Sequence, residues 1–215
     1  MVPRLLAPAL LVLALLAGCS DEDSGSATDS GGSGEPTPTA TTTPTKPDEP
    51  QCPGELAVGE GTELGLGTDE PAAEAPPDVD TPAAAWVCPY DLRDTQSGGE
   101  SGAEPDPRWV PSGPGRFVPD ARLADLAASL SELEPAPVDR VCTADLGRRL
   151  LLVVPREDGL TGVVMDEFGC RDVRMTDDPF SSTPAGDEDG EGTVAGVLTG
   201  PVSLHAVLSV NAAPQ

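Results

Sequence analysis

The side chains that most often carry hydrolytic chemistry are scarce in this chain. Its single histidine, His205, stands in the apolar stretch LHAVL, where a histidine on a packed element is more common than a general base. The serine of GGESGAE has the wrong spacing for a Gly-x-Ser-x-Gly elbow. We therefore assign no catalytic residue and do not expect an enzyme.

Carboxylates are abundant, with 37 aspartates and glutamates, so the residue types leave a glycosidase-like acid and base open as the alternative. Such a site also needs aromatic rings that stack on sugars. Aromatic residues make up only 3% of the chain, and the candidates are Trp86, Tyr90 and Trp109. We expect Trp86, which stands beside Cys88, to lie in the core instead.

Calcium is the ion that the sequence suits best. The run DEDGEG places Asp187, Asp189 and Glu191 at alternating positions on a glycine-containing loop, and carboxylates are ligands that calcium prefers. The run lacks the spaced acidic residue that ends the twelve-residue calcium loop. We favour a solvated loop and assign no metal site and no cofactor, with a calcium-binding surface protein as a further alternative.

Residues 1–18 have the layout of an export signal. Arg4 precedes an apolar stretch, residues 5–16, which is too short for a bilayer core that needs roughly 20 helical residues. The letters LAGC, residues 16–19, resemble the lipobox of bacterial lipoproteins at every position. The resemblance implies that Cys19 becomes the first mature residue, with a diacylglyceryl group on its sulfur. The alternative is a secreted protein whose signal happens to contain a cysteine.

The composition is biased in a way that agrees with the lipobox. Isoleucine is absent, Lys46 is the only lysine and Asn211 is the only asparagine. Because these residues have AT-rich codons, the bias indicates a GC-rich genome, and the chain resembles an actinobacterial lipoprotein. The resemblance covers the N-terminal quarter closely and implies no binding residue in the rest.

The formal net charge is −25. Nucleic acid and anionic lipid surfaces both attract clustered lysine and arginine, so the charge argues against either as a direct partner of the domain. A lipid on Cys19 must then hold the protein at the membrane, and two acyl chains give the lasting anchor that one does not. We expect a monomer at the extracytoplasmic face of the cell membrane, with an unidentified envelope partner.

Four cysteines remain after Cys19. An even number in an exported chain indicates two disulfides, and the pairs that we favour among three connectivities are Cys52 with Cys88 and Cys142 with Cys170. Zinc is a poor alternative because no two cysteines form a C-x-x-C pair.

The chain divides by composition into three parts. A signal peptide (1–18) precedes a tether (19–51) that is first rich in Ser, Gly and acidic residues and then in Pro and Thr. Neither half of the tether holds enough apolar surface to fold. Residues 52–215 form one extracytoplasmic domain.

The strongest strand pattern lies in the second half of the domain. The apolar residues 150–154 precede an Asp-Gly turn and the apolar residues 163–165, which predicts a hairpin. Val173 and Met175 alternate with charged residues and predict a third strand. Because residues 150–154 are apolar throughout, we expect that strand to be central.

The remaining elements follow from weaker patterns. We predict short strands at 86–88 and 116–118, an exposed loop at 93–109, and an edge strand at 193–198. Leucines three and four residues apart predict a helix within 119–135.

The segment PVSLHAVLSV, residues 201–210, alternates as a strand would, but Pro201 suits the first turn of a helix. We favour the helix. The sequence thus predicts an α+β fold, a small and mostly antiparallel sheet with one or two helices, many loops and two disulfides. Its predicted function is that of a lipid-anchored envelope protein, a non-enzymatic binding or structural module.

Overall fold

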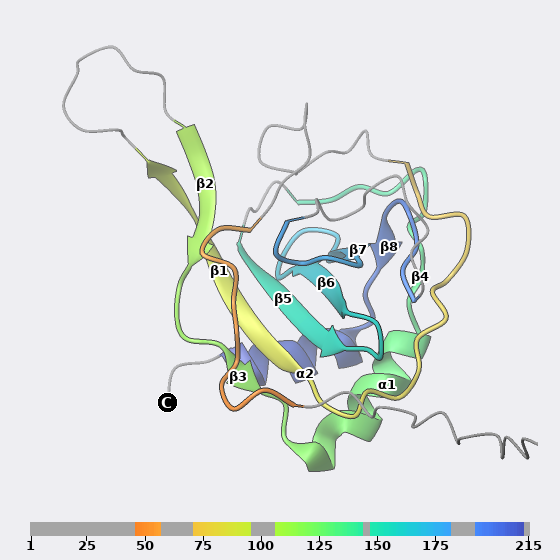
Figure 1. Cartoon of the computed structure of the whole chain (residues 1–215). Coiled ribbons are helices and arrows are strands. Elements are labelled where there is room, and N and C mark those ends of the chain that lie inside the picture. Colours follow the sequence, from red (N-terminus) through yellow and green to blue (C-terminus); the bar gives the residue numbers. More distant parts are fainter. Residues whose placement is uncertain (1–45, 57–70, 96–105, 144–146, 182–191, 213–215) are drawn as a thin grey trace, which may run out of the picture. The chain divides into compact units, whose positions relative to one another are not determined.

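An antiparallel sheet forms the centre of the fold (Figure 1). The computed structural model describes residues 46–56, 71–95, 106–143, 147–181 and 192–212, which belong to a unit that spans Thr41–Gln215. The strand order is β2-β1-β5-β6-β7-β8-β4, and β3 pairs with β1. The strands are β1 (Trp86–Thr95), β2 (Asp106–Pro111), β3 (Arg116–Phe117), β4 (Glu134–Pro135), β5 (Arg148–Pro155), β6 (Leu160–Asp166), β7 (Asp172–Thr176) and β8 (Leu198–Thr199).

Two α-helices accompany the sheet, α1 (Leu123–Ser131) and α2 (Val202–Ala212). A 3₁₀ turn, Asp120–Arg122, leads into α1. The predicted α+β class with a mostly antiparallel sheet is therefore confirmed, and so is the helical form of the C-terminal segment. No helix in the described ranges combines the length and the apolar character that a membrane crossing requires.

The strand β5 is central, as its apolar run predicts. It pairs with β1 on one side and β6 on the other, and every residue from Arg149 to Val154 is buried. Alternate side chains of a strand point to opposite faces of a sheet. A strand that is apolar on both faces must therefore be covered on both.

Both helices cover the same face of the sheet. Leu126 and Leu130 of α1 and Leu204 and Leu208 of α2 are fully buried, and they share one apolar cluster with Leu152 of β5. Because leucines recur at spacings of three and four along α1, they form a single stripe toward the sheet.

The opposite face carries a second apolar cluster, which contains Trp86, Tyr90 and Trp109. The Trp86 indole donates to the Gln51 carbonyl over 2.6 Å, and the Tyr90 hydroxyl donates to the Pro53 carbonyl over 2.8 Å. These three rings are at most 2% exposed. They are core residues, as expected for Trp86, and none is available to stack on a sugar.

The end of the segment predicted to be a tether packs on the sheet. The Lys46 ammonium lies 4.3 Å from the centre of the Phe117 ring, and Gln51 accepts the Trp86 hydrogen bond. Residues 46–51 therefore contact the folded domain that was expected to begin at Cys52.

Two disulfides join distant segments, and they are the pairs that the sequence favours. Cys52 bonds to Cys88, 36 residues away, and ties the segment before the sheet to β1. Cys142 bonds to Cys170, 28 residues away, and ties the chain before β5 to the β6–β7 connection.

Two expectations about strands were wrong. Arg93–Thr95 and Asp106–Trp109 extend a hairpin of β1 and β2 instead of forming an exposed loop, and Trp109 is buried. Within 193–198 only Leu198 belongs to a strand, β8, which lies between β7 and β4 and not at an edge. The position of a strand in a sheet depends on pairing with strands that are distant in the sequence, and a local sequence pattern does not predict that pairing.

Candidate ligand pocket

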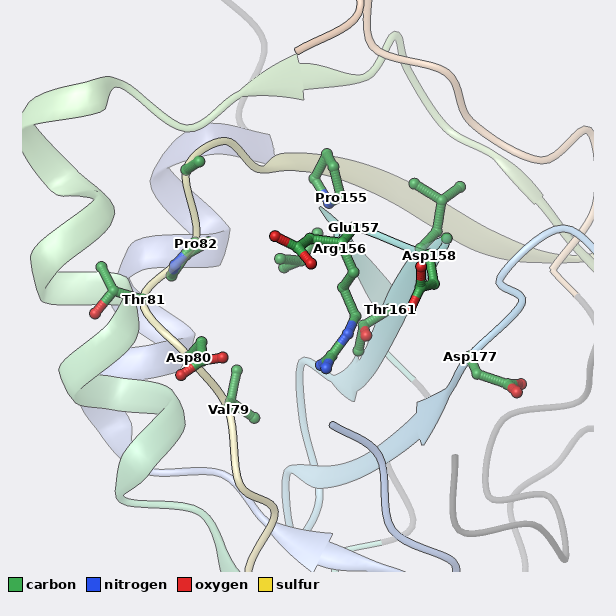
Figure 2. Close-up of a pocket in the computed structure, with 14 residues that line it drawn as sticks. Val79, Asp80, Thr81, Pro82, Pro155, Arg156, Glu157, Asp158, Thr161 and Asp177 are labelled. Atoms are coloured by element: carbon green, nitrogen blue, oxygen red, sulfur yellow. The ribbon is translucent and has the colours of Figure 1, made fainter. Parts of the chain in front are cut away.

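A pocket of about 510 Å³ opens beside the tip of the β5–β6 hairpin (Figure 2). Three segments line it: the chain that approaches β1, the hairpin tip, and the residue that follows β7. Its volume lies within the range of small-molecule sites. The lining residues are Val79, Asp80, Thr81, Pro82, Ala83, Val154, Pro155, Arg156, Glu157, Asp158, Gly159, Leu160, Thr161 and Asp177.

A hydrogen bond within the turn holds the backbone of the hairpin tip, which carries charged side chains. The Arg156 amide donates to the Gly159 carbonyl over 2.9 Å. Glu157 and Asp158 stand at the tip and are exposed. The Asp-Gly turn predicted from sequence thus positions two of the pocket's carboxylates.

Arg156 is the only basic residue on the pocket lining. Its guanidinium lies against Gly192, where a Cβ would come within 1.5 Å of Nη1. Gly192 also has a φ of +72°, a conformation that a side chain strains. The φ of Gly192 therefore favours glycine at this position, whereas the Arg156 guanidinium, at the end of a flexible side chain, could shift away from a Cβ.

Thr161 supplies an unusual polar group at the start of β6. Its side chain belongs to the helix-covered side of the sheet, since Thr161 is opposite Val154 in the register. The residue is 2% exposed, and its hydroxyl has no hydrogen-bond partner among the described residues. A buried hydroxyl without a partner is costly, which singles out Thr161 within the pocket.

The acidic side chains surround these two residues. Figure 2 shows Arg156 and Thr161 lying between Asp80 on one side and Asp177 on the other. Four carboxylates in all line the pocket, against one guanidinium. Within the described ranges no three His, Cys, Asp or Glu side chains are grouped to hold a metal ion, so these carboxylates do not converge on one point.

A second group of charges lies on the opposite face of the sheet, outside the pocket. The Asp166 carboxylate lies 2.7 Å from Arg149 Nε and 3.1 Å from Arg174 Nη1. Asp172 accepts from Arg140, with Nη2 at 2.8 Å from Oδ2. We call these five residues the ionic ladder. Arg149 and Arg174 are each 2% exposed, whereas Arg140 and Asp166 are half-buried, so the two strand arginines are the buried part of the ladder.

Asp172 of the ladder has a raised pKa. Burial raises the pKa of Asp172, while Arg140 and Arg174 act in the opposite direction. A glycosidase-like acid would combine a raised pKa with a place in an open pocket. Asp172 is not among the residues that line this one.

The residues singled out from the sequence are distributed widely. Cys19 and the candidate calcium ligands Asp187, Asp189 and Glu191 lie outside the described residues. His205 is half-buried on α2, and its Nε2 has no partner within the described part of the chain. It does not line the pocket.

Sequence reasoning missed the pocket itself. The Asp-Gly turn was predicted without any site role for Glu157 or Asp158, and Asp80 and Asp177 come from segments whose sequences show no strand or helix pattern. Thr161 looks like an ordinary strand residue, and only the structure shows that its hydroxyl lacks a partner.

No protein family model, curated protein or solved structure gives a significant match to this chain. The function must therefore be argued from the residues and the pocket.

Proposed function

We propose that this protein is a lipid-anchored component of the cell envelope whose domain binds a small ligand without transforming it. Cys19 carries the lipid, and residues 20–45 separate it from the part of the domain described by the structure. The observation that supports binding is the 510 Å³ pocket, whose lining combines apolar and polar or charged residues in equal parts.

The two disulfides fit this location. Structural disulfides persist in oxidising compartments outside the cytoplasm, and both bonds here join segments at least 28 residues apart. The export signal and the bonded cysteines thus point to the same side of the membrane.

Asp172, whose pKa is raised by burial, is a candidate acid, but it lies outside the pocket lining. Its carboxyl group is held between Arg140 and Arg174. Its position serves the sheet and offers no proton to a ligand in the pocket.

Fragment mapping by NMR tests the binding role. The mature chain, held in detergent, is titrated with a fragment library that mixes cationic, anionic and neutral compounds. We expect fragments to shift the amide signals of Ala83, Gly159 and Thr161 and to be recovered unchanged. A library that perturbs no pocket amide would contradict binding, and fragments with a glycosidic bond that are recovered cleaved would favour the enzyme.

A further inference from the structure

The charges on the pocket lining are strongly unequal. The lining includes four acidic residues, Asp80, Glu157, Asp158 and Asp177, and a single basic residue, Arg156. The whole chain adds to this field, since its net charge is −25. A concave site of one sign concentrates ligands of the other sign, so the pocket attracts cations and repels anions.

The spacing of the carboxylates indicates what kind of cation fits. A metal ion needs several ligands converging on one point within a few ångströms, and the described residues contain no such group. Carboxylates spread around about 510 Å³ suit a cation of several atoms. Ammonium and guanidinium groups on a carbon skeleton meet this requirement.

The apolar lining indicates the rest of the ligand. Val154 and Leu160 lie on the two strands of the hairpin, and Pro82 and Ala83 lie on the chain before β1. Val79, on the same segment, also packs against the helix-side core. These surfaces can bury a short hydrocarbon chain, which water does not solvate well.

Thr161 gives the pocket an independent polar contact. Its hydroxyl is buried and has no partner among the described residues. A hydroxyl can accept a hydrogen bond from an N–H group as well as donate one. A ligand with an ammonium or guanidinium group would supply the missing partner once the side chains that cover this hydroxyl move aside.

We infer that the pocket binds a small organic cation, an amine or guanidine on a short aliphatic chain, through its carboxylates and the Thr161 hydroxyl. This inference rests on the proposed binding function and names the ligand class. The carboxylates set the preference for positive charge, the apolar walls hold the carbon chain, and Thr161 orients the N–H group.

Three probes of matched size test the charge preference: n-butylamine, which is protonated at pH 7, sodium butanoate and butan-1-ol. Each is titrated into the mature chain in detergent, and the amide signals of Ala83 and Thr161 are followed by NMR. We expect butylamine to bind at least tenfold more tightly than the other two, and its affinity to fall as salt is added.

Variants test the residues. Asp80→Asn and Asp177→Asn should each weaken butylamine binding about fivefold, the upper end of the loss expected for one solvent-exposed ion pair. Asp139→Asn, at an exposed carboxylate outside the pocket lining, is the matched control and should leave the affinity unchanged.

Thr161→Val separates a ligand contact from a structural one. Valine has the same shape without the buried hydroxyl, so this variant should melt at a higher temperature yet bind butylamine several-fold more weakly. Thr161→Ser keeps the hydroxyl and should retain most of the affinity.

The outcomes distinguish the two proposals. Butanoate or butanol binding as tightly as butylamine overturns the cation inference, while the binding function stands. The inference also fails if no probe shifts a pocket amide, but the binding function fails only if the mixed fragment library avoids the pocket as well.

Discussion

The ionic ladder shows how single residues stabilise the face of the sheet opposite the two described helices. Asp166 accepts from Arg149 and Arg174, and the Arg149 guanidinium lies 4.6 Å from the centre of the Trp109 ring. Buried charges are stable only when each has its partners. Loss of the shared carboxylate should therefore cost more than loss of a surface charge.

Asp166→Asn tests this. The substitution leaves two buried arginines without the carboxylate between them, so we expect the free energy of unfolding to fall by about 3 kcal/mol. Urea denaturation followed by circular dichroism measures it. Asp139→Asn, at an exposed carboxylate, is the control and should change it by less than about 0.5 kcal/mol. A loss below about 1 kcal/mol for Asp166→Asn would show that the ladder does not depend on this group.

Glu167 makes the acid stability of the domain predictable. Hydrogen bonds from Arg148 lower the pKa of Glu167 below its ordinary value of 4.5. A carboxylate with a lowered pKa contributes stability that is fully present above its ordinary pKa and is lost as the pH falls through its folded pKa.

Glu167→Gln should therefore be less stable than the wild type at pH 7 by about 1 to 2 kcal/mol, because it loses a charged pair of hydrogen bonds. The difference should shrink as the pH falls below 4.5. Thermal melts of both proteins from pH 7 to pH 2 measure it. If the melting temperatures of the two proteins fall in parallel across this pH range, the Arg148–Glu167 pair does not determine the loss of stability in acid.

The elements show which parts of the fold a sequence can predict. The hairpin of β5 and β6, the strand β7 and the helix α1 follow from local apolar patterns, which burial on one or both faces imposes. The helix α2 was favoured because of Pro201, since its apolar residues alternate as they would in a strand. The strand β2 was missed because Pro107, Arg108 and Pro111 obscure its alternation, although its Trp109 is 1% exposed. The pocket was missed for a related reason: it joins segments that touch only after the sheet has formed.

The two disulfides should differ in what their removal costs. In the chain-entropy model either bond contributes roughly 3 kcal/mol through loop closure. Cys88 is also 1% exposed and packs in the cluster of Trp86 and Tyr90, whereas Cys142 is only half-buried.

Replacing Cys142 and Cys170 together by serine should lower the free energy of unfolding by about 3 kcal/mol. Replacing Cys52 and Cys88 together should cost more, because serine also places polar groups in an apolar cluster. Urea denaturation of both double variants gives the comparison. An equal or smaller loss for the Cys52 and Cys88 pair would contradict this ranking.

At the scale of the whole molecule, the net charge and the proposed lipid anchor have opposite effects on binding to the membrane. A net charge of −25 repels an anionic membrane surface, while two acyl chains on Cys19 would hold the chain there with roughly 0.8 kcal/mol for each buried methylene. The attachment must then be hydrophobic, and added salt should not release the protein.

Fractionation of cells that produce the wild type or Cys19→Ala tests this central claim most directly. We expect the wild-type protein in the membrane fraction at both low and high salt, and the variant in the soluble fraction. Ser24→Ala, in the tether, is the matched control and should stay with the membrane. A Cys19→Ala protein that remains in the membrane fraction would contradict the lipid anchor.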